Sequence, residues 1–364
     1  MLNNVKVSII TVSFNSVKTI EQTIKSVINQ TYKSIEYIII DGASTDGTQQ
    51  VIEKYKDRIS FYVSEKDDGL YYAMNKGIEH ASGDIVGIIN SDDWYVEDAV
   101  ENMVVCMLET DADLAYGKVV NINTDGREET IGYKPLEKIW CYGVIHHPSV
   151  FVKRKIYEKY GVFNTGYRIY SDYDLLLRFY SKGIRFEFND KVIAYFRVGG
   201  LSTTQQYDAW NEPYTIAMSY IDKCPNRNEV EKIVNIEHQW SFLRKEIAVG
   251  SSELLGFFNR NFKKDKKKVI IFGTGIWSER CYKILSQSDV AVTCFADNNP
   301  SRWNTQFHDI HIINPSELKN MDAYVLIAVK EHGNEIKEQL NSMENDALKC
   351  VTINELMKMY WNRQ

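Results

Sequence analysis

The stretch that decides the fold reads Ile85-Val86-Gly87-Ile88-Ile89-Asn90-Ser91-Asp92-Asp93-Trp94. An apolar, β-branched run that stops at two acids predicts a strand with both carboxylates at the carboxyl edge of a sheet, where open α/β sheets bind ligands. Oxygen ligands on a short turn suit Mg²⁺ or Mn²⁺, which proteins usually hold through one or two carboxylates plus a substrate's phosphates. The alternative is structural, with Asp92 or Asp93 capping a helix that starts near Tyr95.

Strands and helices alternate through the first third of the chain. Apolar runs predict strands at 7–12, 35–40, 59–63 and 85–89, with helical segments between them. This order implies the α/β class, a mostly parallel sheet with helices on both faces. The middle of the chain is mixed. Its predicted elements are strands at 113–122, 128–133, 148–152, 184–188 and 191–198 and a helix from Ser171 to Gly183.

The last third changes character twice. After about residue 204 the chain is helical and polar up to Asn261, and a lysine-rich run follows at 263–268. A second α/β unit starts at Val269, where an apolar strand leads into a glycine turn. We therefore predict three parts: a first α/β domain over 1–204, a helical linker over 205–265, and a smaller α/β domain over 266–364.

The composition excludes several classes of protein. A net charge of −6 and a pI near 5.8 argue against a nucleic-acid-binding protein. The six cysteines are scattered and include no Cys-x-x-Cys pair, as in a reduced cytosolic protein. The first residues lack the features of a signal peptide, and no apolar run reaches the ~20 residues of a membrane span. We predict a cytoplasmic protein and leave open its contact with the inner face of the plasma membrane.

Polar clusters also follow other predicted strands. Asp41 ends the strand at 35–40, which places it at the same edge as Asp92 and Asp93. Asp41 can accept a hydrogen bond there from a base or a ribose hydroxyl. In the alternative interpretation it is an ordinary turn residue. Asp68 and Lys76 border a short polar helix and can meet a nucleotide and its phosphates. The alternative for Lys76 is a solvated lysine on a surface helix.

Two acids and two histidines mark the middle of the chain. Asp172 and Asp174 fall in the first turn of the helix from Ser171, where the helix dipole favours anions whatever their function. In the functional interpretation Asp172 points into a cleft as a general base and Asp174 serves the helix. His146 and His147 are adjacent, which makes joint chelation of a metal unfavourable. We expect one to line an acceptor pocket and one to pack, and we assign the pocket to His147.

Together these pieces resemble family 2 glycosyltransferases of the GT-A fold. The likeness covers about residues 5–204 and is carried, in order, by 7–15, 41–48, 90–94 and 171–175. Each segment is weak alone, but the ordered set is specific. Segments 68–77 and 196–202 also look like the branch that assembles bacterial polysaccharides.

The resemblance implies an inverting transfer of a sugar from a nucleotide-sugar, commonly a UDP-sugar. The acceptor is a hydroxyl of a glycan or lipid-linked molecule in surface polysaccharide assembly. By the family's pattern, Asp41 contacts the base, Asp92 the ribose, and Asp93 holds Mn²⁺ or Mg²⁺ on the diphosphate. Asp172 matches the catalytic base. These roles suit the chemistry, because a metal neutralises the leaving diphosphate and one carboxylate takes the acceptor's proton.

The implied site extends beyond these four acids. We assign Phe14, Asp68 and Lys76 to the nucleotide-sugar, and Arg197 to the acceptor or its pocket. The chain departs from many relatives at Gly42, where they carry a second acid, and from some at Asn90. It also lacks the Gln-x-x-Arg-Trp signature of processive synthases, which favours the transfer of one sugar per acceptor.

The C-terminal unit resembles Rossmann-like units appended to sugar-processing proteins. Gly273 and Gly275 lack the third glycine of a dinucleotide fingerprint, and Asp297 follows at about the right distance. Nucleotide or sugar-nucleotide binding and a structural or oligomerising role both stay open. The apolar run 254–262 before the lysines can rest on an anionic bilayer or pack on the transferase domain.

Two other functions compete with transfer. One is a non-catalytic sugar-nucleotide-binding scaffold or sensor that works through the C-terminal unit, but such a protein does not need Asp172. The other is an NAD-dependent oxidoreductase, which rests only on the glycine pair and Asp297.

Overall fold

The computed structural model describes residues 5–200, 207–262, 267–288 and 290–363. The chain divides into two compact units, 1–238 and 239–364, and the division falls within the helix α9 (Arg227–Val249). The boundaries that we predicted at 204 and 265 lie outside the described residues, so the three-part division stays a prediction. Within the described ranges, no helix is both long and apolar enough to cross a bilayer.

In the described part of the first unit, nine strands form one mixed sheet of order β3-β2-β1-β4-β8-β6-β9-β5, with β7 paired to β6. The strands are β1 (Val7–Ser13), β2 (Ile35–Asp41), β3 (Phe61–Ser64), β4 (Ile85–Asn90), β5 (Trp94–Tyr95), β6 (Leu114–Ile122), β7 (Glu128–Ile131), β8 (Phe151–Lys153) and β9 (Phe186–Arg197). The first four in this list run parallel in register. Asp41 lies opposite both Ser13 and Ser64, and Val12 lies opposite Asn90. The carboxyl ends of these strands therefore meet at one edge.

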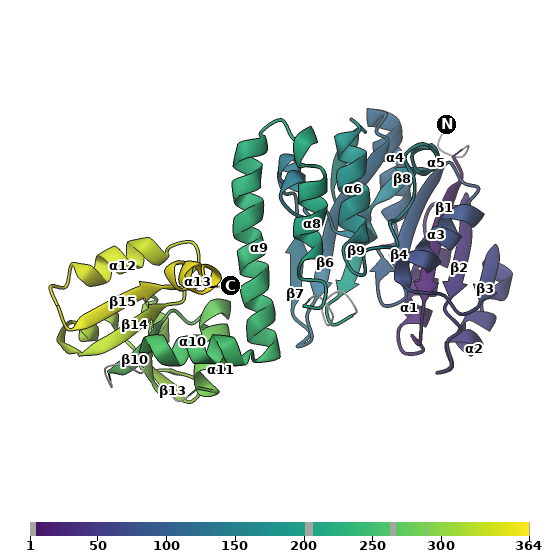
Figure 1. Ribbon diagram of the computed structural model, residues 1–364. Helices are drawn as coiled ribbons and strands as arrows, with labels where there is room; N and C mark the ends of the chain where they lie inside the picture. The colour runs from purple at the N-terminus through teal and green to yellow at the C-terminus, as the bar shows by residue number, and fades with distance from the viewer. Residues whose placement is uncertain (1–4, 201–206, 263–266, 289, 364) are drawn as a thin grey trace. The chain divides into compact units, whose positions relative to one another are not determined.

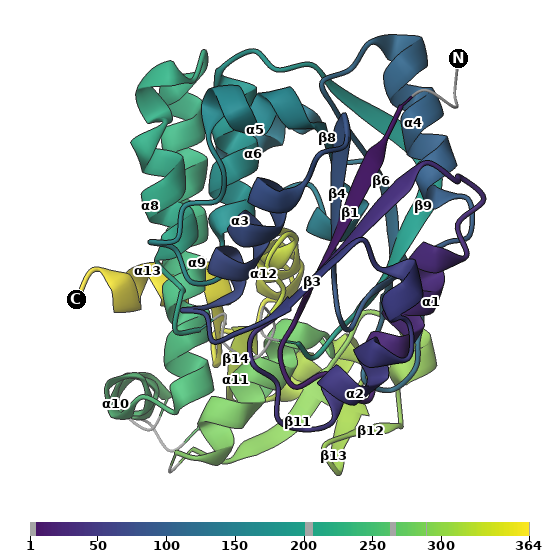
Figure 2. The ribbon, with the colours of Figure 1, turned by 90° about the vertical axis from the view of Figure 1, so that its right-hand side faces the viewer.

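Helices cover both faces of this sheet (Figures 1 and 2). On one face lie α1 (Ile20–Ile28), α2 (Thr48–Glu53) and α4 (Ala99–Thr110). On the other lie α3 (Leu70–His80), α5 (Arg154–Tyr160), α6 (Ser171–Ser181) and α8 (Glu212–Ser219). Consecutive Ile9 and Ile10 join different cores, because successive strand side chains point to opposite faces. Both are fully buried, and burial of each stabilises the fold by roughly 1.5–3 kcal/mol.

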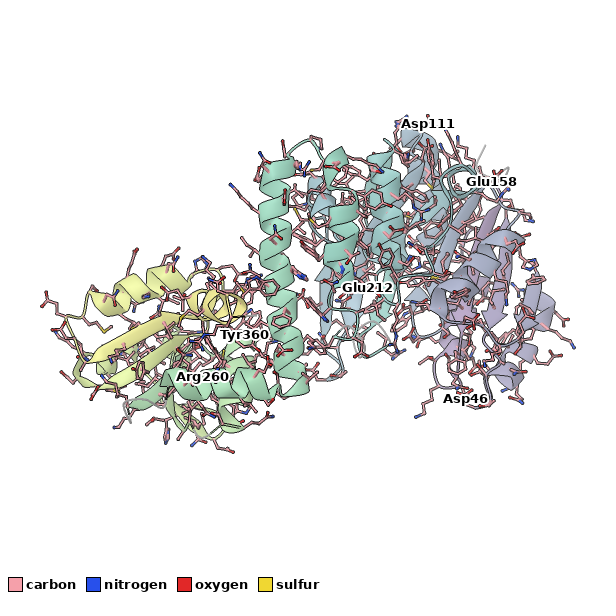
Figure 3. All side chains as sticks on the ribbon, viewed as in Figure 1. Asp46, Asp111, Glu158, Glu212, Arg260 and Tyr360 are labelled. Carbon is pink, nitrogen blue, oxygen red and sulfur yellow. The ribbon has the colours of Figure 1, made fainter. Side chains whose placement is uncertain are left out.

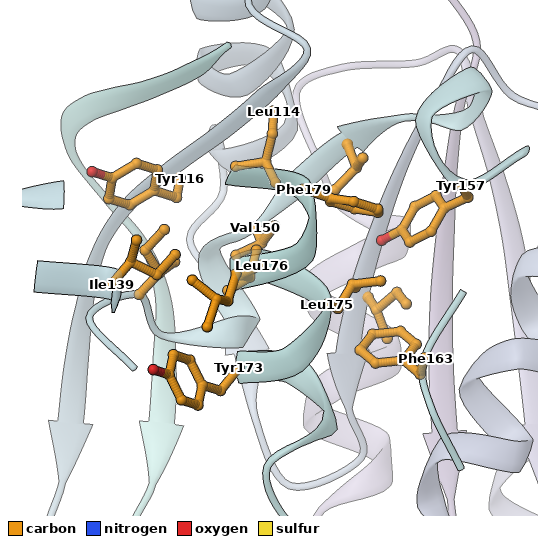
Figure 4. Packing of buried hydrophobic residues seen from close by; sticks show 14 of the residues in the cluster. Leu114, Tyr116, Ile139, Val150, Tyr157, Phe163, Tyr173, Leu175, Leu176 and Phe179 are labelled. Carbon is orange, nitrogen blue, oxygen red and sulfur yellow. The ribbon is translucent and has the colours of Figure 1, made fainter. Parts of the chain in front are cut away.

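The helix α6 is held on the sheet by an apolar stripe. Leu175, Leu176 and Phe179 follow helical spacing and are buried against Leu114 and Tyr157 (Figure 4). Gly183, with φ of 74°, ends the helix in the left-handed conformation, as predicted. This packing fixes the first turn of α6, which carries Asp172.

The predicted helix near Tyr95 is wrong. Trp94 and Tyr95 instead form β5, which pairs antiparallel with Tyr195 and Ala194 of β9. Stacking of Trp94 on Tyr195, with ring centroids 4.9 Å apart, stabilises this pairing. The helix α4 begins at Ala99 with Asp98 as its N-cap. Neither Asp92 nor Asp93 therefore caps a helix, and the structural alternative for that pair fails.

Two other predicted elements differ in extent. The strands at 184–188 and 191–198 are one strand, β9, whose register against β6 shifts near Gly117 and Lys118. The polar residues of that irregular stretch had the sequence pattern of a turn. The strand at 148–152 starts later, at Phe151, because His147–Ser149 form a 3₁₀ turn, η4.

The second unit has its own sheet. In its described residues, the strand order is β12-β13-β11-β10-β14-β15, with all pairs parallel except β12 with β13. The strands are β10 (Lys268–Phe272), β11 (Val292–Ala296), β12 (Gln306–Phe307), β13 (Ile310–Ile313), β14 (Ala323–Ile327) and β15 (Leu348–Thr352). One face packs on α10 (Ser252–Phe262), α11 (Ile276–Ser286) and α13 (Ile353–Trp361), and the other on α12 (Gly333–Asn341). Its Rossmann-like character stays a prediction.

Candidate active site

Two loops at the carboxyl edge of the first sheet are tied together. The side-chain hydroxyl of Ser44 accepts from the backbone N–H of Asn15 at 2.7 Å, and the Asn15 side chain accepts from the Thr45 N–H at 2.9 Å. Asn15 and Ala43 both have positive φ, at 49° and 60°. Such backbone costs of order 1–3 kcal/mol and persists only where neighbouring contacts fix it. The loops after β1 and β2 thus form a rigid surface at the carboxyl edge of the sheet, which we call the floor.

Asp41 is part of this floor. It is fully buried, and its carboxylate accepts from the Ser44 N–H at 2.9 Å, the Ser44 hydroxyl at 2.5 Å and the Ser64 hydroxyl at 2.6 Å. The side chain thereby joins β2 to β3 and to its own turn. Contact of Asp41 with a base stays a prediction.

Phe14 stands above the floor and is 66% exposed, although it follows a fully buried strand. The Phe14 ring and the Asp67 carboxylate both border Gly42. A Cβ built on Gly42 would lie 3.3 Å from the ring and 3.1 Å from Asp67 Oδ2. The sequence pattern indicated Asp68, whereas Asp67 is the residue that borders Gly42. The acidic pair before a glycine was the available signal, but it did not say which of the two faces the edge.

Asp68 and Lys76 line a cavity of about 650 Å³ together with Asp67, Tyr72 and residues of α5. Lys76 Nζ lies 2.5 Å from Glu65 Oε1, so this lysine forms an ion pair at the end of β3. The structure thus brings Asp68 and Lys76 to one cavity, which Asp67 also lines. Their contact with a nucleotide stays a prediction.

Asp93 is fully buried where β4 meets the end of β9. Its Oδ1 accepts from the backbone N–H of Arg197 at 3.0 Å, and the Arg197 Nε donates to the Asp92 carbonyl at 3.2 Å. The guanidinium also lies over the Trp94 ring, 5.0 Å from its centroid. Arg197 therefore holds the turn that carries both acids.

The charges of Asp92 and Asp93 are poorly compensated. Burial raises the pKa of both carboxyls, and the neighbouring Asp92 charge raises the pKa of Asp93 further. Asp93 Oδ2 is buried and has no hydrogen-bond partner in the described part of the chain, and the same holds for Asn90 Oδ1. A buried oxygen without a partner costs about 1–3 kcal/mol, so its presence requires an explanation.

The donor set fits a divalent cation. Carboxylate and amide oxygens are the protein ligands that Mg²⁺ and Mn²⁺ favour. Across the described residues, no group of three or more His, Cys, Asp and Glu side chains forms a complete metal cage. An ion here would therefore rely on one or two protein oxygens, with water and substrate phosphates as its other ligands.

Asp172 lies in the first turn of α6 and is half-buried. Its Oδ1 accepts from the Tyr173 N–H at 2.8 Å. Burial, with a smaller contribution from the nearby charge of Glu212, raises the pKa of Asp172 to about 6. A carboxyl with a pKa near the working pH suits general base catalysis. Asp174, by contrast, accepts from the Tyr220 hydroxyl at 3.1 Å and lies 3.6 Å from Arg178, which makes it a packing residue.

Glu212 is a residue of this region that the sequence did not reveal. It begins α8 (Figure 3), and its carboxylate accepts from the backbone N–H groups of Arg168 at 2.7 Å, Ile169 at 3.1 Å and Tyr170 at 3.0 Å. Tyr71 of α3 donates to the Ile169 carbonyl in the same loop. These contacts fix the three residues that lead into α6. Residues 201–206, which precede Glu212 in the chain, are outside the described ranges.

The two histidines face different neighbours. His146 packs on Phe196, next to Arg197, with ring centroids 6.5 Å apart. His147 packs on Phe163 at 5.7 Å, and Phe163 stacks in turn on Tyr71. Burial lowers the pKa of each to about 4, so both are neutral at neutral pH. The adjacent pair thus connects the Asp93 region with the Asp172 region, and the assignment of His147 to an acceptor pocket stays a prediction.

Comparison with known proteins follows the same division of the chain. The model of glycosyl transferase family 2 matches residues 8–175. The uncharacterised glycosyltransferase MT1564 of Mycobacterium tuberculosis is 30% identical over 177 residues, which are 47% of this chain and 68% of that protein. The chain belongs to glycosyl transferase family 2. The predicted family is therefore confirmed, and with it the predicted class of enzyme.

Other relatives of this family are matched over smaller parts. The putative teichuronic acid biosynthesis glycosyltransferase TuaG of Bacillus subtilis is 35% identical over 146 residues, which are 39% of this chain and 53% of TuaG. GlyA of Streptococcus pneumoniae is 31% identical over 125 residues, which are 34% of this chain but 18% of GlyA. The chain thus spans about half of TuaG and less than a fifth of GlyA.

Solved structures confirm the GT-A fold. Staphylococcus aureus TarS 1–349, in complex with UDP-GlcNAc, matches with a TM-score of 0.53 at 17% identity, over 70% of this chain and 87% of that one. The mannosyltransferase PcManGT of Pyrobaculum calidifontis, with GDP-Man and Mn²⁺, matches with a TM-score of 0.52 at 18% identity, over 71% and 79%. In the second unit, a family model described as C2185-like, N-terminal, matches residues 265–351.

Proposed function

We propose that the first unit transfers a sugar, with inversion and with a divalent metal, from a UDP-sugar to a hydroxyl of a glycan or lipid-linked acceptor in surface polysaccharide assembly. The observation that carries this proposal is the buried Oδ2 of Asp93 at the carboxyl edge of the sheet, which has no hydrogen-bond partner within the described ranges. The names of TuaG and the TarS complex support the polysaccharide and UDP parts of the proposal.

The donor binds across the ends of β1, β2 and β4. The exposed Phe14 ring stacks on the base, and the neighbouring Asp67 accepts from the base N–H. Asp41 supports this contact from below by holding the floor. Asp92 accepts from the ribose hydroxyls, and Asp68 and Lys76 border the cavity next to the base.

Asp93 Oδ2 would hold Mn²⁺ or Mg²⁺ together with the oxygens of the diphosphate. When bound, such an ion would supply positive charge that stabilises the leaving diphosphate, so no general acid would be required. Arg197 keeps Asp93 in place through its backbone N–H, and its stacking on Trp94 fixes the end of β9.

Asp172 takes the proton of the acceptor hydroxyl. The acceptor oxygen then forms its bond to the anomeric carbon as the bond from that carbon to the diphosphate breaks, and UDP leaves with the electron pair. Attack from the face opposite the diphosphate inverts the anomeric centre. Glu212 acts as a positioning residue, because it fixes the loop that leads into Asp172.

The proposal is tested by the thermal stability of the full chain with UDP-, GDP- and dTDP-sugars, each with Mn²⁺ and with a chelator. Binding to the folded state alone raises the melting temperature, so we expect stabilisation by UDP-sugars that is lost on chelation. The matched control is Asp93→Asn, which keeps an acceptor for the Arg197 N–H and should lose the Mn²⁺-dependent part. Stabilisation by GDP-sugars only would overturn the UDP assignment, and chelator-resistant stabilisation would overturn the metal.

A further inference from the structure

The sheet of the second unit reverses its order at β10. From β10 the chain proceeds outward through β11 and β13, and then crosses back so that β14 and β15 lie on the other side of β10. In open parallel sheets the loops at such a reversal diverge, and ligands bind in the crevice outside the carboxyl ends of the two central strands. Here those strands are β10 and β14.

The loop after β10 is built around two glycines with different surroundings. Gly273 has φ of 102°, and a Cβ there would lie 3.0 Å from Val329 Cγ2, so this position requires glycine. Gly275 has ordinary φ of −94°, and a Cβ there would meet nothing within 4 Å. Gly275 is the N-cap of the eleven-residue helix α11 and supplies no side-chain cap. A side chain at Gly275 would therefore enter open space at the N-terminal end of α11, where the helix dipole favours an anion.

Ser278 provides a second, independent observation. It lies in the first turn of α11 and is fully buried, and its hydroxyl has no hydrogen-bond partner in the described part of the chain. The Oγ lies 3.1 Å from the position that a Cβ on Gly273 would take, so it points at the glycine loop. Buried hydroxyls are normally paired, and this one is directed at the glycine loop without a partner among the residues that the structure describes.

An acid stands beside this loop. Asp297 follows β11, the strand next to β10, and its Oδ2 accepts from the Thr274 hydroxyl at 2.6 Å. Its Oδ1 accepts from the Asn299 N–H at 2.8 Å. The Asp297 carboxylate thus lies at the end of the adjacent strand and is fixed to the loop that precedes α11. It is suitably placed to accept hydrogen bonds from the two hydroxyls of a ribose.

We propose that the loop 273–275, the first turn of α11 and Asp297 form a second ligand site, for a nucleoside diphosphate. The phosphates lie on the N–H groups of α11 and accept from Ser278, and the ribose hydroxyls donate to Asp297. The site belongs to the second unit alone and is independent of sugar transfer at Asp93.

Hydrogen–deuterium exchange of the full chain with ADP, UDP or inorganic phosphate tests this site. At a ligand concentration ten times Kd, we expect peptides within 269–285 to exchange about tenfold more slowly with ADP or UDP. Peptides that contain residues 13–16 and 90–94 report separately on the first unit, so failure of one site is distinguished from failure of the other. No slowing within 269–285 by either nucleotide would overturn the proposal, and equal slowing by inorganic phosphate would overturn the ribose contact.

Gly275→Asp supplies a variant that keeps the fold. The position has room for a side chain, and aspartate is a favoured N-cap, so the protein should be at least as stable as the wild type. Its charge repels a phosphate, and we expect nucleotide affinity at this site to fall about tenfold or more. Gly275→Asn is the matched control, since it caps without charge and should retain more of the binding. Unchanged affinity in Gly275→Asp would overturn the phosphate position.

Discussion

Asp41 and Asp93 are both fully buried acids at the same edge of the same sheet, yet their surroundings differ. Asp41 accepts three hydrogen bonds from Ser44 and Ser64, whereas Asp93 accepts from the Arg197 N–H through Oδ1 and keeps a buried Oδ2 that has no partner among the described residues. Burial alone thus does not distinguish these two acids from each other. The number of hydrogen bonds that the protein itself supplies does.

The largest expected effect is at Asp93. Asp93→Asn removes the carboxylate but keeps an oxygen that can accept from the Arg197 N–H. Loss of a residue that only supports a metal ligand lowers activity by up to about 100-fold. Because Asp93 is itself the proposed ligand, we expect the rate of sugar transfer to fall by more than about 100-fold. The free energy of unfolding of the metal-free protein should rise, because a poorly compensated buried charge disappears. Transfer assays and urea denaturation check the two parts. Full activity in the variant would remove the metal from the mechanism.

The same substitution at Asp41 should affect stability more than sugar transfer. Asp41→Asn weakens hydrogen bonds between a charged acceptor and Ser44 and Ser64, and we expect a loss of about 2 kcal/mol in the free energy of unfolding. Transfer by the fraction that stays folded should change less than in Asp93→Asn. If Asp41→Asn leaves stability unchanged but abolishes donor binding, the comparison fails and Asp41 is a ligand of the base.

The pH dependence of transfer extends the comparison to Asp172. The pKa of its carboxyl is about 6, and only the deprotonated form can accept a proton. We therefore expect kcat/KM to rise about tenfold per pH unit below that value and to level off above it. Asp172→Asn should lose turnover and keep donor binding. A collapse of donor affinity in that variant would make Asp172 a donor ligand instead.

The smallest expected effect is at Glu212. Glu212→Gln removes a charge that raises the pKa of Asp172 and replaces one oxygen that accepts backbone N–H groups. We expect the break in the kcat/KM profile to move to lower pH and kcat to fall roughly tenfold, with the KM for the donor little changed. A purely structural role would lower stability and leave the position of the break unchanged.

The sequence predicted the parallel core of the first unit because runs such as 7–12, 35–40 and 85–89 are buried on both faces and read as continuous apolar strands. It did not predict β5, since two aromatic residues after an acidic pair gain strand structure only by pairing with distant Tyr195 and Ala194. It did not reveal Glu212 for the same reason. Nothing in the sequence of its own helix sets that glutamate apart. Its role comes from hydrogen bonds with loop 168–170, which lies more than forty residues earlier in the chain.

The left-handed backbone at Ala43 has a consequence for engineering. A glycine would relieve the steric cost of that conformation, so a screen for heat resistance alone would favour Ala43→Gly. The same change would loosen the turn on which the donor is proposed to rest. Selection for thermal stability should therefore favour glycine at position 43, whereas selection for turnover should retain Ala43.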